Sequence, residues 1–97
     1  MEFEKDVELE LGRRVERSGG LYIKAGQQGW PDRIVMLPGG RLVWVELKRN
    51  GGRLSALQRF RHAQLRERGQ QVVTIWSRED IDRLMEDLQW EDQEQKR

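Results

Sequence analysis

Two apolar runs separated by a Pro-Gly-Gly turn at 38–40 constrain this sequence more than any other feature. The first run (R-I-V-M-L) follows a Pro-Asp pair, and the second (R-L-V-W-V-E-L-K) begins directly after the turn. Such a turn between two runs of strand-forming residues is typical of a β-hairpin with antiparallel strands. If residues 38–40 form the loop, Leu37 faces Arg41 and Asp32 lies directly across from Glu46.

The alternation of side chains along a strand places the charged residues of this hairpin on one face. Glu46 and Lys48 point to the same side of their strand, and Asp32 joins them from the opposite strand. Opposed carboxylates destabilise a sheet unless a cation neutralises them, and a divalent metal ion would do so. Both faces are otherwise apolar, so we expect burial on both sides. The residues beside the charged group are Ile34, Met36, Leu42 and Trp44, and those of the other face are Val35, Leu37, Val43 and Val45.

A different loop length would change this geometry completely. A two-residue loop formed by Gly39 and Gly40 alone would put Leu47 opposite Asp32 and send the two carboxylates to opposite faces. We favour the longer loop because it gives the charged residues of the hairpin a shared site.

Periodic apolar residues and a glycine pair predict the elements before the hairpin. Residues 4–18 are expected to form a helix, because Val7, Leu11 and Val15 recur every four residues and a Gly-Gly pair follows. Residues 21–25 are expected to form a short strand, which a glycine-containing loop connects to the hairpin.

A helix, a strand and a second helix are expected after the hairpin. Residues 55–68 form the first helix, with Ser55 as its N-cap and Gly69 as its stop. A right-handed crossover then places the strand at 71–76 parallel to the second hairpin strand. The expected fold class is mixed α/β, in the order α-β-β-β-α-β-α, with helices flanking a mixed sheet. The last helix has its apolar residues at helical spacing, at Ile81, Leu84, Met85 and Leu88.

Composition limits the chemistry that the chain can use. The sequence has no cysteine and a single histidine, which excludes disulfides and thiolate zinc sites and makes a serine–histidine triad hard to build. A catalytic centre therefore has to use carboxylates, lysine and glutamine. With 97 residues, we expect one domain over 1–90 and a polar, frayed tail at 91–97. No stretch resembles a membrane span or a signal peptide, so the expected location is the cytoplasm.

Basic residues gather in the middle of the sequence although the net charge is only +1. Residues 41–68 carry eight basic and two acidic side chains, whereas the segments on either side are net acidic. An arginine-rich surface beside a metal-type site indicates a polyphosphate backbone as partner. The simpler interpretation is a solvated helix face. The residues expected to contact DNA are Lys24, Arg49, Arg53, Arg59 and Arg61.

The acidic pair and Lys48 suit metal-dependent hydrolysis of a phosphodiester. This reaction needs an activated water and compensation of the charge that develops on the phosphoryl group. Mg²⁺ prefers carboxylate oxygens, so Asp32 and Glu46 would hold it, with the Leu47 carbonyl as a further ligand. Lys48 would activate the water or stabilise the developing anion. The alternative is a surface ion pair between Lys48 and one of the acids, because E-x-K alone is a weak signal.

Three further polar positions have two interpretations each. Glu8 lies beside the apolar stripe of the first helix and could reach the site, with Glu4 and Glu10 as rivals. Gln58 fits a capping box and also lies on the helix face toward the sheet, so both capping and site support remain open. His62 is one turn further along, and we expect it to be packed or solvated.

Three segments together resemble the PD-(D/E)xK nuclease superfamily, and in more detail the virus-type replication–repair nuclease (VRR-NUC) domain. They are G-W-P-D-R-I-V at 29–35, V-E-L-K at 45–48 and L-S-A-L-Q at 54–58. The resemblance extends from about residue 4 to residue 88. It implies a restriction-endonuclease-like core, dependence on Mg²⁺ or Mn²⁺, and endonuclease activity on branched DNA.

The resemblance also implies roles for individual residues. A glutamate of the first helix completes the acidic site in that family, and its spacing to the Gly-Gly stop corresponds to Glu8 in this sequence. The helix glutamine of the family corresponds to Gln58. Trp30 departs from the pattern, because it is bulkier than the residue usually found between that glycine and the proline.

Stand-alone members of this family are thought to cut four-way (Holliday) junctions as homodimers, and the likeness suggests a phage or prophage origin. A two-fold symmetric junction suits an isologous dimer. Trp76, Trp90 and the first helix are interface candidates, with core packing as the alternative for each. The rival functions are a nuclease that acts on flaps, nicked or single-stranded DNA, a non-catalytic DNA-binding module, and a plain structural protein.

Overall fold

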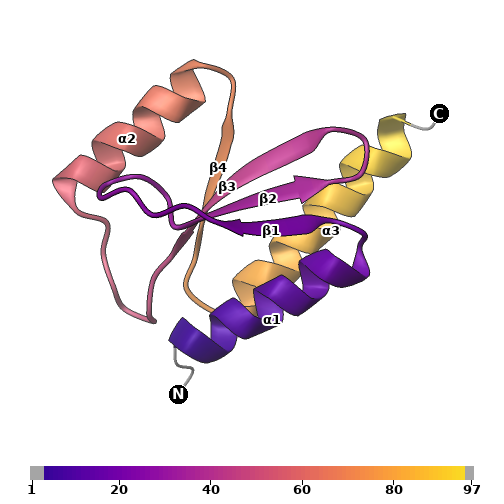
Figure 1. The fold of residues 1–97 in the computed structure, drawn as a ribbon, viewed down its shortest axis with the longest axis horizontal. Helices are drawn as coiled ribbons and strands as arrows, with labels where there is room; N and C mark the ends of the chain where they lie inside the picture. Colours follow the sequence, from indigo (N-terminus) through magenta and orange to yellow (C-terminus); the bar gives the residue numbers. More distant parts are fainter. Residues whose placement is uncertain (1–3, 96–97) are drawn as a thin grey trace.

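The computed structural model describes the backbone of residues 4–95 and the side chains of residues 5–88. Helices and strands follow the order expected from the sequence, and the fold is mixed α/β (Figure 1). The elements are α1 (Glu4–Arg17), β1 (Leu21–Lys24), β2 (Arg33–Leu37), β3 (Arg41–Leu47), α2 (Ala56–Glu67), β4 (Gln71–Ile75) and α3 (Arg78–Gln95).

The four strands form one sheet in the order β1-β2-β3-β4. β1, β2 and β3 are antiparallel neighbours, and β4 lies parallel to β3 at the opposite edge from β1. The parallel pair is the one predicted from the strand–helix–strand segment, since a parallel neighbour requires a crossover connection such as α2.

The register of the β2–β3 hairpin is the one predicted with the longer loop. Leu37 pairs with Arg41 and Arg33 pairs with Val45, so the next pair along the ladder direction is Asp32 and Glu46. Gly39 and Gly40 in the turn have φ values of 90° and 82°, a region that favours glycine. The turn therefore sets which side chains meet at the far end of the hairpin.

Helices α1 and α3 pack together on one face of the sheet (Figure 1). The buried side chains of β2 and β3 on this face are those predicted to lie opposite the charged group. A salt bridge between Arg14 and Asp82, 2.7 Å long, also links the two helices. The core consists of Val7, Leu11, Val15, Val35, Val43, Val45, Leu47, Ile75, Ile81, Leu84, Met85 and Leu88.

Helix α2 covers only one end of the other face, which corrects the expectation that the hairpin is buried on both sides. Leu21, Ile23 and Met36 lie on this face, and 62%, 37% and 37% of their respective surfaces are exposed. The reason is that a short helix docked over the Glu46 end cannot reach the β1 edge. An apolar patch of the sheet is thus left open to solvent.

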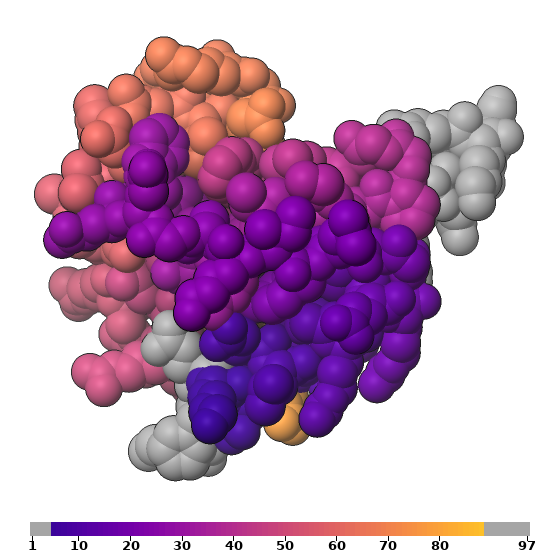
Figure 2. All heavy atoms as spheres, viewed as in Figure 1, coloured from indigo at the N-terminus to yellow at the C-terminus, as the bar shows by residue number. Residues whose placement is uncertain are grey.

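The loop between β1 and β2 lies against α2, and the two segments are adjacent in Figure 2. Gly29 allows this close approach, because a Cβ at this position would lie 2.6 Å from Leu57. The guanidinium of Arg61 lies 4.7 Å from the centre of the Trp30 ring. Trp30 is therefore part of the packing between this loop and α2.

The carboxyl-terminal helix α3 is continuous to Gln95. The frayed tail expected at 91–97 lies largely outside the described side chains, as does Trp90, and stays a prediction. In the described part of the chain, no helix combines the length and the hydropathy that crossing a membrane would require.

Candidate active site

Asp32 lies just before β2, where the preceding Pro31 cannot donate a hydrogen bond to the ladder. Its carboxylate accepts a hydrogen bond that a backbone carbonyl would otherwise accept in the β-ladder. The bond runs from the backbone N–H of Leu47 to Oδ2 and is 2.9 Å long. This bond fixes the aspartate against the end of the neighbouring strand.

Glu46 is a buried carboxylate at the end of β3, with 1% of its surface exposed. Its Oε1 lies 3.1 Å from the Nε2 of His62, and its Oε2 accepts a longer hydrogen bond of 3.4 Å from the Nε2 of Gln58. Both donors come from the inner face of α2. A buried charge needs such partners, because desolvation would otherwise be very costly.

Gln58 makes the contacts of a helix cap and also contacts Glu46, so its position is compatible with both interpretations of the sequence. Its side-chain Oε1 accepts a hydrogen bond of 2.8 Å from the backbone N–H of Ser55, while the Ser55 hydroxyl accepts one of 3.1 Å from the Gln58 backbone. This is a complete capping box at the start of α2. Because the amide oxygen is used in the cap, the amide nitrogen is turned toward Glu46.

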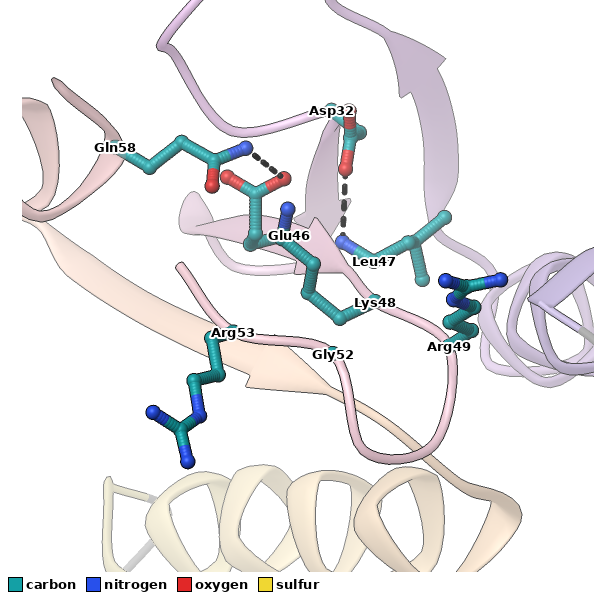
Figure 3. Close-up of a pocket in the computed structure, with 8 residues that line it drawn as sticks. All are labelled: Asp32, Glu46, Leu47, Lys48, Arg49, Gly52, Arg53 and Gln58. Atoms are coloured by element: carbon teal, nitrogen blue, oxygen red, sulfur yellow. Dashed lines mark hydrogen bonds between the residues drawn. The ribbon is translucent and has the colours of Figure 1, made fainter. Parts of the chain in front are cut away.

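A cavity of about 390 Å³ opens beside these carboxylates (Figure 3). The Lys48 side chain extends toward Glu46 and Asp32, so its ammonium group lies on the same side as the two acids. The guanidinium of Arg53 points away from the acids, whereas that of Arg49 lies on the Leu47 side of the cavity. The residues that line the cavity are Asp32, Glu46, Leu47, Lys48, Arg49, Gly52, Arg53 and Gln58.

The backbone of β3 places the Leu47 carbonyl on the same edge as Asp32. The N–H of Leu47 points to Asp32, while the N–H of Lys48 points the other way and donates to the Ile75 carbonyl of β4 at 3.0 Å. The N–H and C=O of one residue face the same neighbour in a ladder. We call the place where Asp32 and Glu46 meet the acidic corner. The Leu47 oxygen therefore faces the acidic corner, as its predicted role requires.

Glu8 is paired elsewhere in this structure. Its carboxylate forms a salt bridge with Arg33, which also donates a hydrogen bond of 2.9 Å to the Asp32 carbonyl. Glu8 does not line the cavity. Its rival Glu10 does not line it either, and the Glu4 side chain lies outside the described part of the chain.

Tyr22 lies beside the same arginine, whose guanidinium is 5.8 Å from the centre of the phenol ring. Burial raises the pKa of Tyr22 to about 12, with the Arg33 charge acting in the opposite direction and the Glu8 charge reinforcing the effect. This group connects α1 to β1 and β2 behind the acidic corner.

The five residues predicted to contact DNA are spread over three places. Arg49 and Arg53 line the cavity. Arg59 is exposed on α2 and donates to the Leu54 carbonyl at 2.8 Å, and Arg61 covers the Trp30 ring. Lys24 lies at the end of β1, paired with Arg33, and away from the cavity.

His62 makes a contact that its sequence position did not predict. It was expected to be packed or solvated, and it is fully buried, but it also contacts Glu46. Burial lowers the pKa of His62, and the charges of Arg66 and Lys48 act in the same direction. The spacing of four residues from Gln58 was the available signal, because it puts both side chains on one helix face.

The oxygen atoms at this corner fit a hard divalent cation. Two carboxylates and a backbone carbonyl are donors that Mg²⁺ or Mn²⁺ accepts, with water completing the coordination. Among residues 5–88, no group of three or more His, Cys, Asp or Glu side chains could hold an ion. The protein would therefore supply two acids and the Leu47 oxygen, which suits Mg²⁺ because it keeps several waters.

A mixed sheet that carries Asp32, Glu46 and Lys48 at the end of a hairpin, with a supporting helix glutamine, defines a PD-(D/E)xK-type nuclease fold. A scan against models of protein families finds no match. A curated relative, "Putative nuclease p44" of Acyrthosiphon pisum secondary endosymbiont phage 1, is 34% identical over 79 residues, covering 78% of this chain and 85% of the relative.

Among solved structures, a chain described as a VRR_NUC domain is 33% identical and superimposes with a TM-score of 0.79. The alignment covers 86% of this chain and 94% of that one. The chain belongs to the VRR-NUC family of nucleases. The likeness inferred from the three sequence segments is thereby confirmed.

Proposed function

We propose that this protein is a metal-dependent endonuclease that hydrolyses phosphodiesters in branched DNA. The observation that carries the proposal is the convergence of Asp32, Glu46 and Lys48 on one cavity at the end of the β2–β3 hairpin. Family membership supports the reaction class, and the donor chemistry of the corner supports Mg²⁺ or Mn²⁺ as the cofactor.

Each residue of the corner has a distinct task in this proposal. Asp32 and Glu46 hold the ion, which when bound polarises the phosphodiester and makes water a better nucleophile. The Leu47 N–H keeps the Asp32 carboxylate in place. Lys48 stabilises the negative charge that develops on the phosphoryl group, or takes the proton of the attacking water.

The basic surface around the cavity supports DNA as the substrate. Arg49 and Arg53 line the cavity, where they can contact the phosphates on either side of the scissile bond. Arg59 lies nearby on α2 and extends the positive surface. Such contacts position the backbone without reading the base sequence, which suits an enzyme selective for DNA shape.

Glu8 belongs to the proposed acidic site as a mobile member. In the structure it pairs with Arg33, so it would reach the ion only after this salt bridge opens. Arg33 is anchored on the Asp32 carbonyl, directly beside the corner. Arg33 therefore links Glu8 to the backbone of Asp32.

We further propose that two copies act together on a four-way junction. The open patch on the sheet, formed by Leu21, Ile23 and Met36, supports a second copy as its partner, since soluble proteins rarely expose contiguous apolar surface without use. A two-fold axis through such a patch would present two cavities for paired cuts. Trp76 is less suited to this role, because its indole N–H donates to the Gly52 carbonyl at 2.8 Å.

Cleavage of a panel of labelled oligonucleotides tests the proposal. The panel contains a four-way junction, a flap, a nicked duplex and a single strand, each incubated with Mg²⁺ or with EDTA. We expect paired, symmetric cuts in the junction that require the metal. The matched control is Asp32→Asn, which keeps the shape and an acceptor for the Leu47 N–H but removes the charge.

We expect Asp32→Asn to lower the cleavage rate by roughly 100-fold or more, since loss of a direct ligand should cost at least as much as loss of an outer one. Cleavage that survives EDTA, or that is unchanged in Asp32→Asn, would overturn the metal-dependent mechanism. A preference for the flap or the nicked duplex would overturn the choice of substrate alone. Binding without metal-dependent cutting would indicate a DNA-binding module.

A further inference from the structure

His62, the chain's single histidine, lies directly behind the acidic corner, although it does not line the cavity. It is 0% exposed and projects from the inner face of α2 toward β3. Its Nε2 is 3.1 Å from the Oε1 of Glu46. The glutamate carboxylate is thus held between the imidazole on one side and the cavity on the other.

We propose that His62 is a positioning residue for the proposed nuclease reaction, which holds the Glu46 carboxylate in the orientation needed to bind the metal ion. The inference rests on the proposed function. It adds a residue of α2 that touches neither the DNA nor the ion and acts only through Glu46.

The proposed role of Glu46 sets the direction of this contact. As an ionised metal ligand, the carboxylate can only accept, so the Nε2 of His62 carries the proton and donates to Oε1 at 3.1 Å. The other ring nitrogen, Nδ1, is buried and has no hydrogen-bond partner among the described residues. Within that part of the chain, the imidazole therefore has a single polar contact, which is with Glu46.

His62 and Gln58 contact the two oxygens of the carboxylate at unequal distances. His62 donates to Oε1 at 3.1 Å, whereas the Gln58 amide lies 3.4 Å from Oε2 and is shared with the capping box. The imidazole bond is shorter and fully buried, so it should dominate the orientation of Glu46. Partners behind metal ligands orient those ligands and typically change metal affinity by about 10–100-fold when removed.

A purely structural role for His62 makes a different prediction. In that case the imidazole fills space between α2 and the sheet, and its loss lowers stability but leaves metal binding by the folded protein unchanged. The effect of the imidazole N–H donor must therefore be separated from the effect of the volume of the ring. Substitution of His62 by glutamine or by methionine separates them. Glutamine and methionine are unbranched side chains of similar length, of which only glutamine has an N–H donor.

The experiment compares wild type with His62→Gln and His62→Met. Mn²⁺ affinity is measured by titration calorimetry, and cleavage of the preferred DNA is measured as a function of Mn²⁺ concentration. Glu67→Gln, on the exposed face of the same helix, is the control for surface changes. Urea unfolding in EDTA reports the stability of each variant.

We expect His62→Met to weaken Mn²⁺ binding by roughly 10-fold or more and to raise the metal concentration for half-maximal cleavage by the same factor. The DNA concentration for half-maximal rate should stay unchanged, because His62 does not touch the substrate. His62→Gln should restore most of the affinity. A folded His62→Met variant with the Mn²⁺ affinity of wild type would overturn the inference.

A second variant keeps the test decisive if His62→Met does not fold. His62→Asn is polar and shorter, so its amide cannot reach Glu46, and we expect the same loss of Mn²⁺ affinity. Wild-type affinity in His62→Asn would overturn the inference. If wild type itself neither binds Mn²⁺ nor cleaves DNA, the proposed function fails first, and this result is distinct from a failure of His62 alone.

Discussion

In the proposed mechanism, Lys48 is the residue that separates metal binding from the chemical step. It lies on the same side as Asp32 and Glu46 but is a cation, so it cannot be a ligand while protonated (Figure 3). Its proposed task is confined to the transition state, where negative charge develops on the phosphoryl group. Loss of such an interaction lowers the turnover rate without lowering the affinity for the metal.

We therefore expect Lys48→Met to bind Mn²⁺ with an affinity close to that of wild type and to cut DNA roughly 100-fold or more slowly. Methionine keeps the unbranched shape and removes the charge. Calorimetry and single-turnover cleavage provide the two measurements. Lost metal binding in this variant would show that the lysine organises the site rather than takes part in the reaction.

Tyr22 provides a pH-dependent test of the packing behind the acidic corner. Because burial raises the pKa of Tyr22 to about 12, the neutral phenol is favoured in the folded state. The stability gained is fully present below the unfolded pKa of 10 and is lost as the pH rises through the folded pKa.

Tyr22 is the sole tyrosine, so phenolate absorbance reports it alone. At about pH 11, we expect the folded protein to show little phenolate, whereas the protein in urea shows most of the signal. Equal phenolate signals in the two states would contradict the burial of this ring. The variant Tyr22→Phe should lose less stability than wild type between about pH 10 and pH 12.

Among the elements, the start of α2 combines a capping contact and a contact with the proposed site in one side chain. The Ser55 hydroxyl caps the helix, whereas Gln58 both completes the capping box and lies near Glu46. Substitution of Ser55 and of Gln58 should separate the contribution of the cap to stability from the contribution of Gln58 to the site, because only Gln58 reaches Glu46.

We expect Ser55→Ala to lower the free energy of unfolding by about 1 kcal/mol and to leave the cleavage rate nearly unchanged. Gln58→Ala should cost a similar amount of stability and also slow cleavage, because Glu46 loses a donor. Urea unfolding and metal-dependent cleavage are the measurements. Equal cleavage rates in the two variants would assign Gln58 to capping alone.

The arrangement of elements could be predicted from the sequence wherever local chemistry determines it. The Pro-Gly-Gly turn specified the register that places Asp32 across from Glu46, and the strand–helix–strand length specified a parallel β4. Ser55 was recognised as a cap because the capping box is a contact between near neighbours in the chain.

The features that sequence did not predict depend on how elements dock. The contact between His62 and Glu46 requires α2 to lie over one end of the sheet, and the pairing of Glu8 with Arg33 requires α1 to lie against β2. The open patch arises because α2 covers only that end. Local periodicity does not predict these contacts, because it indicates which face of a helix or strand is buried but not which residues of another element that face contacts.

For the whole molecule, the proposed junction cleavage requires one small chain to act on a symmetric substrate. The molecule measures 40 × 33 × 19 Å, so its longest axis is comparable with one turn of DNA. A single acidic corner in the described residues can act on one strand at a time. Two copies related by a two-fold axis would supply the second corner.

The open patch on the sheet predicts how such a dimer can be broken. We expect Leu21→Lys to convert a dimer into a monomer of 11.6 kDa, because it places a charge in the centre of a buried apolar interface. Size-exclusion chromatography with light scattering measures the mass. On a four-way junction, the same variant should give unpaired nicks in place of paired cuts.

The matched control is Leu9→Lys on the outer face of α1, where the leucine is 50% exposed and away from the sheet patch. We expect this variant to remain dimeric. A dimer that survives Leu21→Lys but not Leu9→Lys would place the interface on the first helix. A monomeric wild type that still makes paired cuts would contradict the dimer proposal altogether.

A crystal structure of the protein grown or soaked with Mn²⁺, with the ion located by its anomalous scattering, tests whether the end of the β2–β3 hairpin binds a divalent metal ion. We expect one or more ions in the cavity, bound to the carboxylates of Asp32 and Glu46 and to the Leu47 carbonyl at about 2.0–2.3 Å. Anomalous density that is absent from this corner at saturating Mn²⁺, or found at another place only, would contradict the account.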